Sequence, residues 1–162
     1  MRIAILTVST AGAAGTRADT SGDAIAVWAR DHKHEVVART LVSDDVNAIV
    51  AALLPWCDDD AADVVLTTGG TGLSPTDRTP EATRVVVERE APGIAEWLRA
   101  SAAGKFPRAV LSRGVAGVRA RTLVVNLPGS PGGVKDTLAA LEAVVEHAVA
   151  VVRGEMGDHE VK

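Results

Sequence analysis

The chain has one cysteine, few aromatic residues and no long apolar run, and each shortage excludes a class of protein. Cys57 is the single cysteine among 162 residues, so no disulfide can form within the chain. The four histidines lack the spacing that builds a tetrahedral zinc site from several Cys or His ligands. No apolar run reaches the roughly 18 residues that a membrane span needs, and the first ten residues lack the apolar core of a signal peptide. We therefore expect a soluble cytoplasmic protein with no membrane partner.

Aromatic residues and positive charge are both too scarce for a nucleic-acid-binding surface. One Phe, three Trp and no Tyr cannot form a platform on which successive bases stack. The formal net charge of −4 also disfavours a protein that follows a phosphate backbone. A small phosphorylated ligand remains compatible, because a few local Arg, Lys or backbone N–H groups are enough to bind it.

The order of apolar segments predicts one α/β domain, and 162 residues are enough for one sizeable core. Segments typical of strands are 2–8, 34–42, 63–67, 114–120 and 122–127, and segments typical of helices are 20–32, 43–55, 79–90, a stretch around 94–98 and a long stretch ending near 152. Strands thus alternate with helices, which predicts a mainly parallel sheet covered on both sides. Residues 9–20 are expected to be a loop, 104–113 are ambiguous, and 154–162 form a polar C-terminal tail.

The segment Thr67–Thr83 carries the most informative pattern in the chain. It indicates the end of a buried strand, a glycine-rich turn and a helix start, with Thr79 as N-cap followed by Pro80. In Gly69–Gly72 the scarcity of β-carbons would let backbone N–H groups approach an anion closely. The same glycines also fit a tight turn that needs positive φ. No Gly-Lys-Ser/Thr follows, and a third spaced glycine is missing, so the turn is neither a P-loop nor a dinucleotide fingerprint.

A second loop, Pro128–Gly133, precedes the long C-terminal helix. Its Ser130 fits an N-cap with Pro131 at the first helical position, and the free N–H groups of that helix end would also attract an anion. No histidine lies in any of the loops, so a serine hydrolase is excluded.

Loops that follow parallel strands emerge at one edge of the sheet, so distant segments should meet there. We expect the loops 9–20, 67–79 and 127–133 to converge, together with Asp44 after the second strand. A carboxylate such as Asp77 beside bound phosphates needs a cation, and Mg²⁺ prefers one or two carboxylates plus phosphate oxygens. Each aspartate also has a purely local interpretation. Asp44 could be a helix N-cap, for which Ser43 and Asp45 are rivals, and Asp77 could be a turn residue or a partner of Arg78.

Basic residues near these loops could neutralise phosphate charge. Arg113 and Lys135 lie at predicted loop edges, and Arg78 and Arg84 lie close by in sequence. Any one of them could equally be an ordinary surface charge.

These segments resemble the MoaB/Mog family of molybdenum-cofactor biosynthesis proteins, whose domain also occurs in gephyrin and its plant counterpart. The resemblance is carried by Thr67–Thr83, 126–131, Ser9, 14–17, 19–23, 41–44, 89–93 and 111–113. It spans nearly the whole chain in order and assigns a MoaB/Mog-like domain to residues 1–153. The family implies a three-layer α/β/α fold, a homotrimer, and contact with other cofactor-biosynthesis enzymes.

The resemblance also implies an activity and a set of site residues. Its best-known activity is molybdopterin adenylyltransferase, in which the terminal phosphate of molybdopterin attacks the α-phosphate of ATP and releases pyrophosphate. Asp44 and Asp77 match the family's catalytic acidic residues and would hold Mg²⁺, either directly or through water. The expected binding residues for molybdopterin and ATP are Ser9, Thr68, Gly69, Gly70, Thr71, Gly72, Ser112, Arg113, Asn126, Pro128, Gly129 and Ser130. The alternative is a non-catalytic paralogue that binds molybdopterin as a scaffold; the isolated molybdate-insertion enzyme carries further domains for which this chain has no room.

Overall fold

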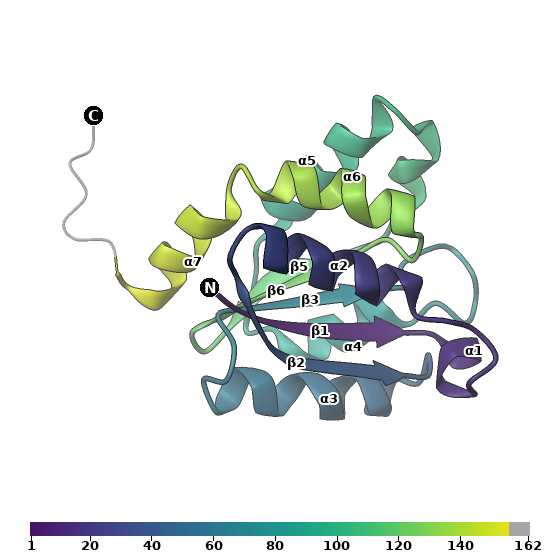
Figure 1. Ribbon diagram of the computed structural model, residues 1–162, viewed down its shortest axis with the longest axis horizontal. Coiled ribbons are helices and arrows are strands. Elements are labelled where there is room, and N and C mark those ends of the chain that lie inside the picture. Colours follow the sequence, from purple (N-terminus) through teal and green to yellow (C-terminus); the bar gives the residue numbers. More distant parts are fainter. Residues whose placement is uncertain (156–162) are drawn as a thin grey trace.

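The structure, a computed structural model, describes residues 1–155 and contains one six-stranded sheet (Figure 1). The strands are β1 (Arg2–Val8), β2 (Glu35–Val42), β3 (Val64–Thr68), β4 (Arg89–Glu90), β5 (Ala116–Arg119) and β6 (Thr122–Leu127), in the spatial order β2-β1-β3-β6-β5-β4. The first four in that order run parallel, whereas β5 is antiparallel to β6 and β4 is antiparallel to β5. In register, Thr7 lies beside Thr68, and Thr68 lies beside Leu127. Three parallel strands therefore end at the same level.

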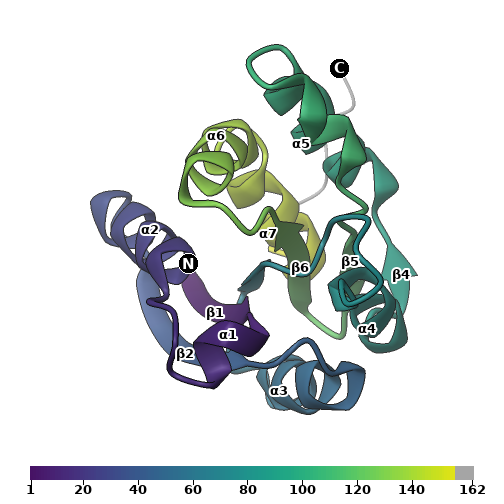
Figure 2. The same cartoon turned by 90° about the vertical axis from the view of Figure 1, so that its right-hand side faces the viewer.

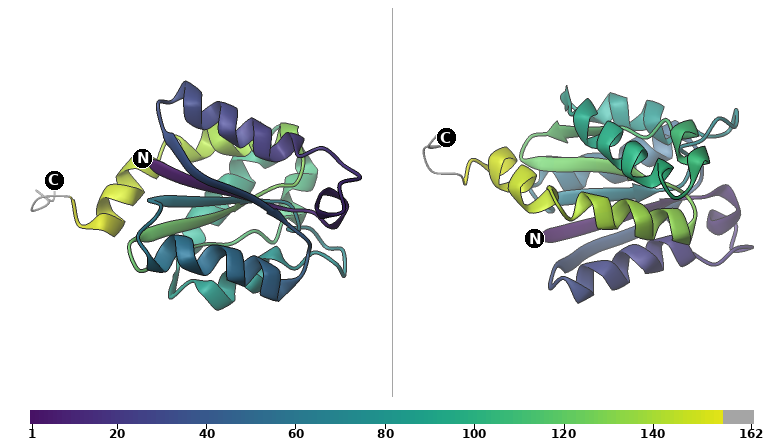
Figure 3. Two further views of the ribbon diagram at one scale, coloured as in Figure 1. Left: turned by 60° about the horizontal axis from the view of Figure 1, so that its bottom comes forward. Right: turned by 90° about the horizontal axis from the view of Figure 1, so that it is seen from above.

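Helices cover both faces of the sheet, which gives three α/β/α layers. The helices are α1 (Thr10–Ala13), α2 (Thr20–Asp31), α3 (Val46–Asp58), α4 (Thr79–Val86), α5 (Pro92–Ala103), α6 (Pro131–Leu141) and α7 (Val145–Arg153), with a 3-10 helix η1 (Pro107–Leu111). Figures 2 and 3 show α2, α5 and α6 on one side of the sheet and α3 and α4 on the other. The predicted single-domain α/β fold with a mainly parallel sheet is confirmed.

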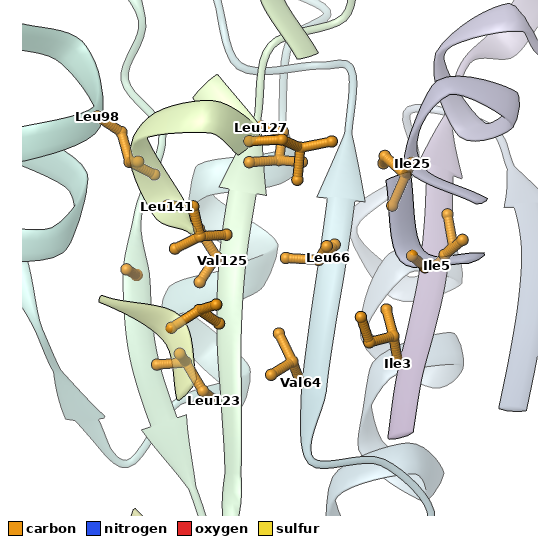
Figure 4. Packing of buried hydrophobic residues seen from close by; sticks show 14 of the residues in the cluster. Ile3, Ile5, Ile25, Val64, Leu66, Leu98, Leu123, Val125, Leu127 and Leu141 are labelled. Atoms are coloured by element: carbon orange, nitrogen blue, oxygen red, sulfur yellow. The ribbon is translucent and has the colours of Figure 1, made fainter. Parts of the chain in front are cut away.

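Two cores form because successive side chains of a strand point to opposite faces. On one face Ile5 and Leu66 pack with Ile25 of α2 and Leu141 of α6 (Figure 4). On the other face a second cluster joins β1, β3 and β6 to α3 and α4; its members include Leu6, Val65, Val124, Leu53 and Val86. Strands buried on both faces read as continuous apolar runs, which is why the sequence showed them clearly.

Several element boundaries differ from the sequence-based expectation. The expected loop 9–20 contains α1, because the Ser9 hydroxyl accepts a hydrogen bond from Gly12 N at 3.0 Å and caps a short turn. Helix α2 is capped by Asp19, which accepts from Gly22 N at 2.9 Å, rather than by Thr20 or Ser21. The carboxylate of Asp19 also forms an ion pair with Arg39.

Three other helix ends were misplaced for reasons of packing. Helix α3 continues past Pro55 to Asp58 and buries Cys57. Helix α4 ends at Val86, four residues before the expected end, since Glu88 N donates to Val118 O and the chain joins the sheet as β4. The expected long C-terminal helix is divided between α6 and α7.

Two further expectations concern the polar C-terminal tail and the lack of a membrane span. Gly154 terminates α7 in the left-handed region at φ 69°, and the rest of the expected polar tail, 156–162, lies outside the described residues. Within residues 1–155, no helix combines the length and apolar character that crossing a bilayer would take.

Candidate functional site

Two adjoining cavities open at the edge where the parallel strands end. The larger measures about 750 Å³ and the smaller about 210 Å³, and both are lined by Gly70, Asp77 and Gly129. Their walls come from the segments after β1, β2, β3 and β6, as the sequence predicted, and in the larger cavity also from α5, η1 and the residues between them. The chain leaves β1 for β2 on one side of the sheet and leaves β3 for β4 on the other side, so a switch point lies between β1 and β3. Open α/β sheets bind ligands at such a point.

The turn after β3 owes its shape to two glycines. Gly69 and Gly70 have φ of +94° and +63°, so the predicted tight turn with positive φ is present. A β-carbon on Gly69 would lie 2.2 Å from Val8 O, and one on Gly70 would lie 2.4 Å from the Thr79 hydroxyl. That hydroxyl donates to Gly69 O at 2.8 Å. Thr79 thus braces the turn instead of capping α4, whose N-cap residue is Arg78 without a side-chain capping bond.

The second loop packs directly against this turn. Thr68 Oγ1 donates to Pro128 O at 2.6 Å, and Ser21 Oγ donates to Gly129 O at 2.9 Å. A β-carbon on Gly129 would lie 3.1 Å from the Gly69 Cα. Ser130 caps α6 as expected, accepting from Gly133 N at 3.2 Å. The N-terminus of an eleven-residue helix therefore faces the larger cavity beside the glycine turn.

Asp44 is held by the loop after β1 and does not cap a helix. Its Oδ2 accepts from Thr10 N at 2.9 Å and from Thr10 Oγ1 at 2.8 Å. The N-cap of α3 is Asp45, which accepts from Ala48 N at 2.8 Å. The half-buried Asp44 lines the smaller cavity, and a β-carbon on Gly70 would lie 3.0 Å from its Oδ1.

Asp77 combines a turn with a place between the cavities. Its Oδ2 accepts from Ser74 N at 3.2 Å, and its own N–H donates to Ser74 O at 3.0 Å. A β-carbon on Gly72 would lie 2.7 Å from the same Oδ2, so only glycine leaves the carboxylate its position. Asp77 lines both cavities and is half-buried.

Arg113 supports the wall from behind. Its guanidinium donates to Gly72 O at 2.7 Å and to Asp77 O at 2.8 Å, and it forms an ion pair with Glu81. The side-chain hydrogen bond between Glu81 and Arg113 lowers the pKa of Glu81 below its usual value. The same bond raises the pKa of Arg113. Arg113 is not among the lining residues of either cavity, and this geometry makes it a support for the loop that carries Asp77.

Asn126 and Ser112 line the larger cavity while serving the backbone. The buried Asn126 accepts from Val115 N at 3.0 Å and donates to Thr67 Oγ1 and Thr83 Oγ1 at 2.8 and 2.9 Å. Ser112 Oγ accepts from Gly114 N at 3.2 Å. Ligand contact by either residue stays a prediction.

The structure brings most of the predicted site residues together. The smaller cavity is lined by Ser9, Asp44, Thr68, Gly69, Gly70, Asp77 and Gly129, and the larger by Gly70, Thr71, Gly72, Asp77, Ser112, Asn126, Pro128, Gly129 and Ser130. Sequence reasoning did not assign Arg17 to the smaller cavity, nor Lys105, Phe106 and Arg108 to the larger one. The only signal for the last three was a basic stretch around Pro107. Its orientation toward the cavity depends on how α5 packs on the sheet, which the sequence alone does not give.

Comparison with known proteins identifies the family. A family model described as "Probable molybdopterin binding domain" matches residues 4–147. The chain belongs to this family. It is 33% identical over 156 residues to a Helicobacter pylori protein named molybdopterin adenylyltransferase, covering 95% of this chain and 89% of that one. Family membership accounts for the convergence of the two glycine loops and of Asp44 and Asp77 at one edge.

Solved structures with similar sequences share this fold. The molybdopterin biosynthesis enzyme MoaB from Thermus thermophilus superposes with a TM-score of 0.89 at 50% identity, covering 94% of this chain and 96% of that one. The molybdopterin biosynthesis Mog protein from Mycobacterium ulcerans gives 0.87 at 42% identity, with coverages of 93% and 97%. Both family names thus occur among the similar structures.

Proposed function

We propose that this protein is a molybdopterin adenylyltransferase of molybdenum-cofactor biosynthesis. A phosphate oxygen of molybdopterin would form a bond to the α-phosphorus of ATP, and the bond from that phosphorus to the bridging oxygen would break to release pyrophosphate. The names of the curated relatives support adenylyl transfer. The observation that carries the proposal is the pair of cavities joined at Gly70, Asp77 and Gly129. Two substrates placed in them would bring their phosphates to one junction.

The residues at that junction suit a reaction between phosphates. The nucleophile is already ionised, so no side chain has to remove its proton, and positioning and charge neutralisation are what the protein must supply. The N–H groups of the Gly69–Gly72 turn and the N-terminus of α6 would orient phosphate oxygens. Arg17 and Arg108 bring positive charge to the walls of the smaller and larger cavity.

The donor set at the junction fits Mg²⁺. Asp44 and Asp77 both line the smaller cavity, and no cluster of three or more His, Cys, Asp or Glu side chains able to hold a metal occurs in residues 1–155. Mg²⁺ commonly takes one or two carboxylates and completes its shell with water and substrate phosphates. Asp44 and Asp77 would hold the ion, directly or through water. Bound there, Mg²⁺ would neutralise phosphate charge as the pyrophosphate leaves.

The proposal is tested by mixing purified protein, molybdopterin, ATP and Mg²⁺ and measuring adenylylated molybdopterin and pyrophosphate together. We expect both products in equal amounts, and loss of both when Mg²⁺ is chelated. Molybdopterin binding without either product would instead identify the alternative, a non-catalytic binding or scaffold paralogue. A cytoplasmic location and contact with other cofactor-biosynthesis enzymes stay predictions.

A further inference from the structure

Phe106 lies outside both hydrophobic cores. It lines the larger cavity and is 55% exposed, between the end of α5 and the start of η1. None of the three tryptophans lines either cavity. Trp97, for example, is tied to α6 through a bond from its Nε1 to Ala140 O at 3.0 Å. Among the described residues, Phe106 is therefore the one Phe, Trp or Tyr that lines these two cavities.

The local backbone holds Phe106 in this position. Its N–H donates to Ala102 O at 2.9 Å, and its carbonyl accepts from Ala109 N at 2.9 Å. Because Pro107 follows, Phe106 takes an extended conformation, φ −139° and ψ 93°, and cannot continue α5. Its backbone is thus hydrogen-bonded on both sides, and the residue lines the cavity.

Arg108 lies near this ring in a cation–π contact. Its guanidinium carbon lies 5.9 Å from the centroid of Phe106. The neighbouring cavity cations have acceptors: Lys105 Nζ donates to Asp136 at 3.0 Å, and Arg99 donates to Gly114 O at 2.8 Å. In residues 1–155 no acceptor for Arg108 is found within hydrogen-bond or ion-pair distance. Phe106 and Arg108 together form an aromatic and cationic edge.

The rest of the cavity lining suits a ligand that has a flat apolar group at one end and a negatively charged group at the other. Ala95, Leu98 and Ala102 of α5 form a smooth apolar wall next to this edge. The glycine turn and the N-terminus of α6 also line the cavity, and there phosphate is favoured. A flat heterocycle linked to phosphate matches both ends.

We propose that Phe106 and Arg108 form a clamp for the heterocyclic ring of a substrate, with the ring stacked on Phe106 and Arg108 closing its edge. The inference rests on the proposed function, which supplies two such rings, the adenine of ATP and the pterin of molybdopterin. Stacking on an aromatic side chain contributes about 1–3 kcal/mol per base, equivalent to about 5- to 150-fold in affinity.

The test compares Phe106→Leu, Phe106→Trp and Arg108→Gln with wild type, measuring kcat and the KM for each substrate. Phe106→Leu keeps the apolar volume and removes the π face, so we expect it to raise the KM for one substrate at least about fivefold while kcat changes less than twofold. Phe106→Trp should keep that KM near wild type, and Arg108→Gln should raise the KM for the same substrate. The affected substrate identifies the ring. Val110→Ala is the matched control, since Val110 lies on η1, is 62% exposed and is not a lining residue.

Failure of the clamp and failure of the proposed function give different results. If wild type makes both products but Phe106→Leu leaves both KM values within twofold, or Arg108→Gln affects only the other substrate, the clamp is overturned. If wild type makes neither product, the proposed function fails, and calorimetric titration with AMP and with free pterin decides the clamp. Weaker binding of either probe by Phe106→Leu would then support it. Equal binding, or no binding by wild type, would overturn it.

Discussion

At the scale of the residue, the two aspartates show how one side chain can be both a local structural element and a part of the site. Asp77 closes a turn through Ser74 N and still lines both cavities. Asp44 is fixed through Thr10 and still lines the smaller cavity. A local role and a functional role are compatible for each aspartate, because a carboxylate has two oxygens and the hydrogen bonds that hold Asp44 and Asp77 use Oδ2.

Replacing either aspartate by asparagine should separate its charge from its shape. Asp44→Asn and Asp77→Asn keep an oxygen acceptor for Thr10 N or Ser74 N and remove the negative charge that would hold Mg²⁺. We expect turnover to fall by about 100-fold or more, on the scale of losing one preorganised electrostatic group. Initial rates of pyrophosphate release would measure this.

Asp45→Asn is the control for these two variants. Asp45 neighbours Asp44, lies outside both cavities and caps α3, where asparagine is an equally good cap. Its turnover should match wild type. Near-normal rates for Asp44→Asn and Asp77→Asn would remove the catalytic role of those residues.

At the scale of the element, the turn between β3 and α4 is the part of the site that tolerates least change. Gly69 bends back against the end of β1, and Thr79 ties the helix start to the turn. Arg113 reaches the same loop from the segment before β5 through Gly72 O and Asp77 O. The loop is therefore rigidly supported from three sides, which suits preorganised phosphate binding.

Gly69→Ala should destabilise the fold. The new β-carbon would meet Val8 O at 2.2 Å in a residue at φ +94°, so backbone must shift. Strain of this kind costs of order 1–3 kcal/mol or more. Urea unfolding would measure it as a lower midpoint.

Gly93→Ala is its counterpart. No atom lies within 4 Å of a β-carbon built there, and φ is not positive. Its free energy of unfolding should stay within about 0.5 kcal/mol of wild type, as is usual for surface substitutions. A Gly69→Ala protein as stable as Gly93→Ala would contradict the view of the turn given above.

At the scale of the whole molecule, an ion-pair network holds the edge of the sheet opposite the site. Arg153 of α7 pairs with Asp60 at 2.8 Å and Asp63 at 3.1 Å, and Arg2 of β1 pairs with both aspartates. These contacts join the C-terminal helix to the starts of β1 and β3.

This network should make stability depend on acid. The hydrogen bond from Arg153, and then that from Arg2, lowers the pKa of Asp60 from the usual 3.8 to about 2. A depressed folded-state pKa contributes stability that is present above pH 3.8 and is lost as the pH falls through about 2. Wild type should therefore melt higher than Asp60→Asn at pH 7, and the difference should shrink between pH 4 and pH 2. Circular dichroism melts across that range would measure it.

Asp31→Asn provides the matching control. Its pair with Arg30 is exposed and 3.7 Å long, so its Tm should follow wild type at every pH. A constant gap between wild type and Asp60→Asn down to pH 2 would show that the Asp60 charge does not carry the contribution.

The family resemblance predicts that the protein forms a homotrimer. Light scattering coupled to size exclusion should give about three times 16.7 kDa at micromolar concentration. A mass near 16.7 kDa would remove the trimer.

The sequence predicted the fold class and the edge of the sheet that carries the site, because both follow from local chemistry. Buried parallel strands are continuous apolar runs, glycines with positive φ mark the turn, and Ser130 with Pro131 marks a helix start. Boundaries such as the end of α4 at Val86 were missed, since they depend on a hydrogen bond to Val118, which lies far along the chain.

Only the tertiary structure decided which predicted residues share a cavity and which support it. Thr10 reaches Asp44 across 34 residues, and Thr68 reaches Pro128 across 60. The structure set Arg113 behind the wall and Phe106 with Arg108 inside the larger cavity. Local sequence fixes backbone conformation through sterics and nearby hydrogen bonds, which act over a few residues. Contacts between distant segments depend on the order of strands in the sheet, and that order is set by the burial of both faces at once.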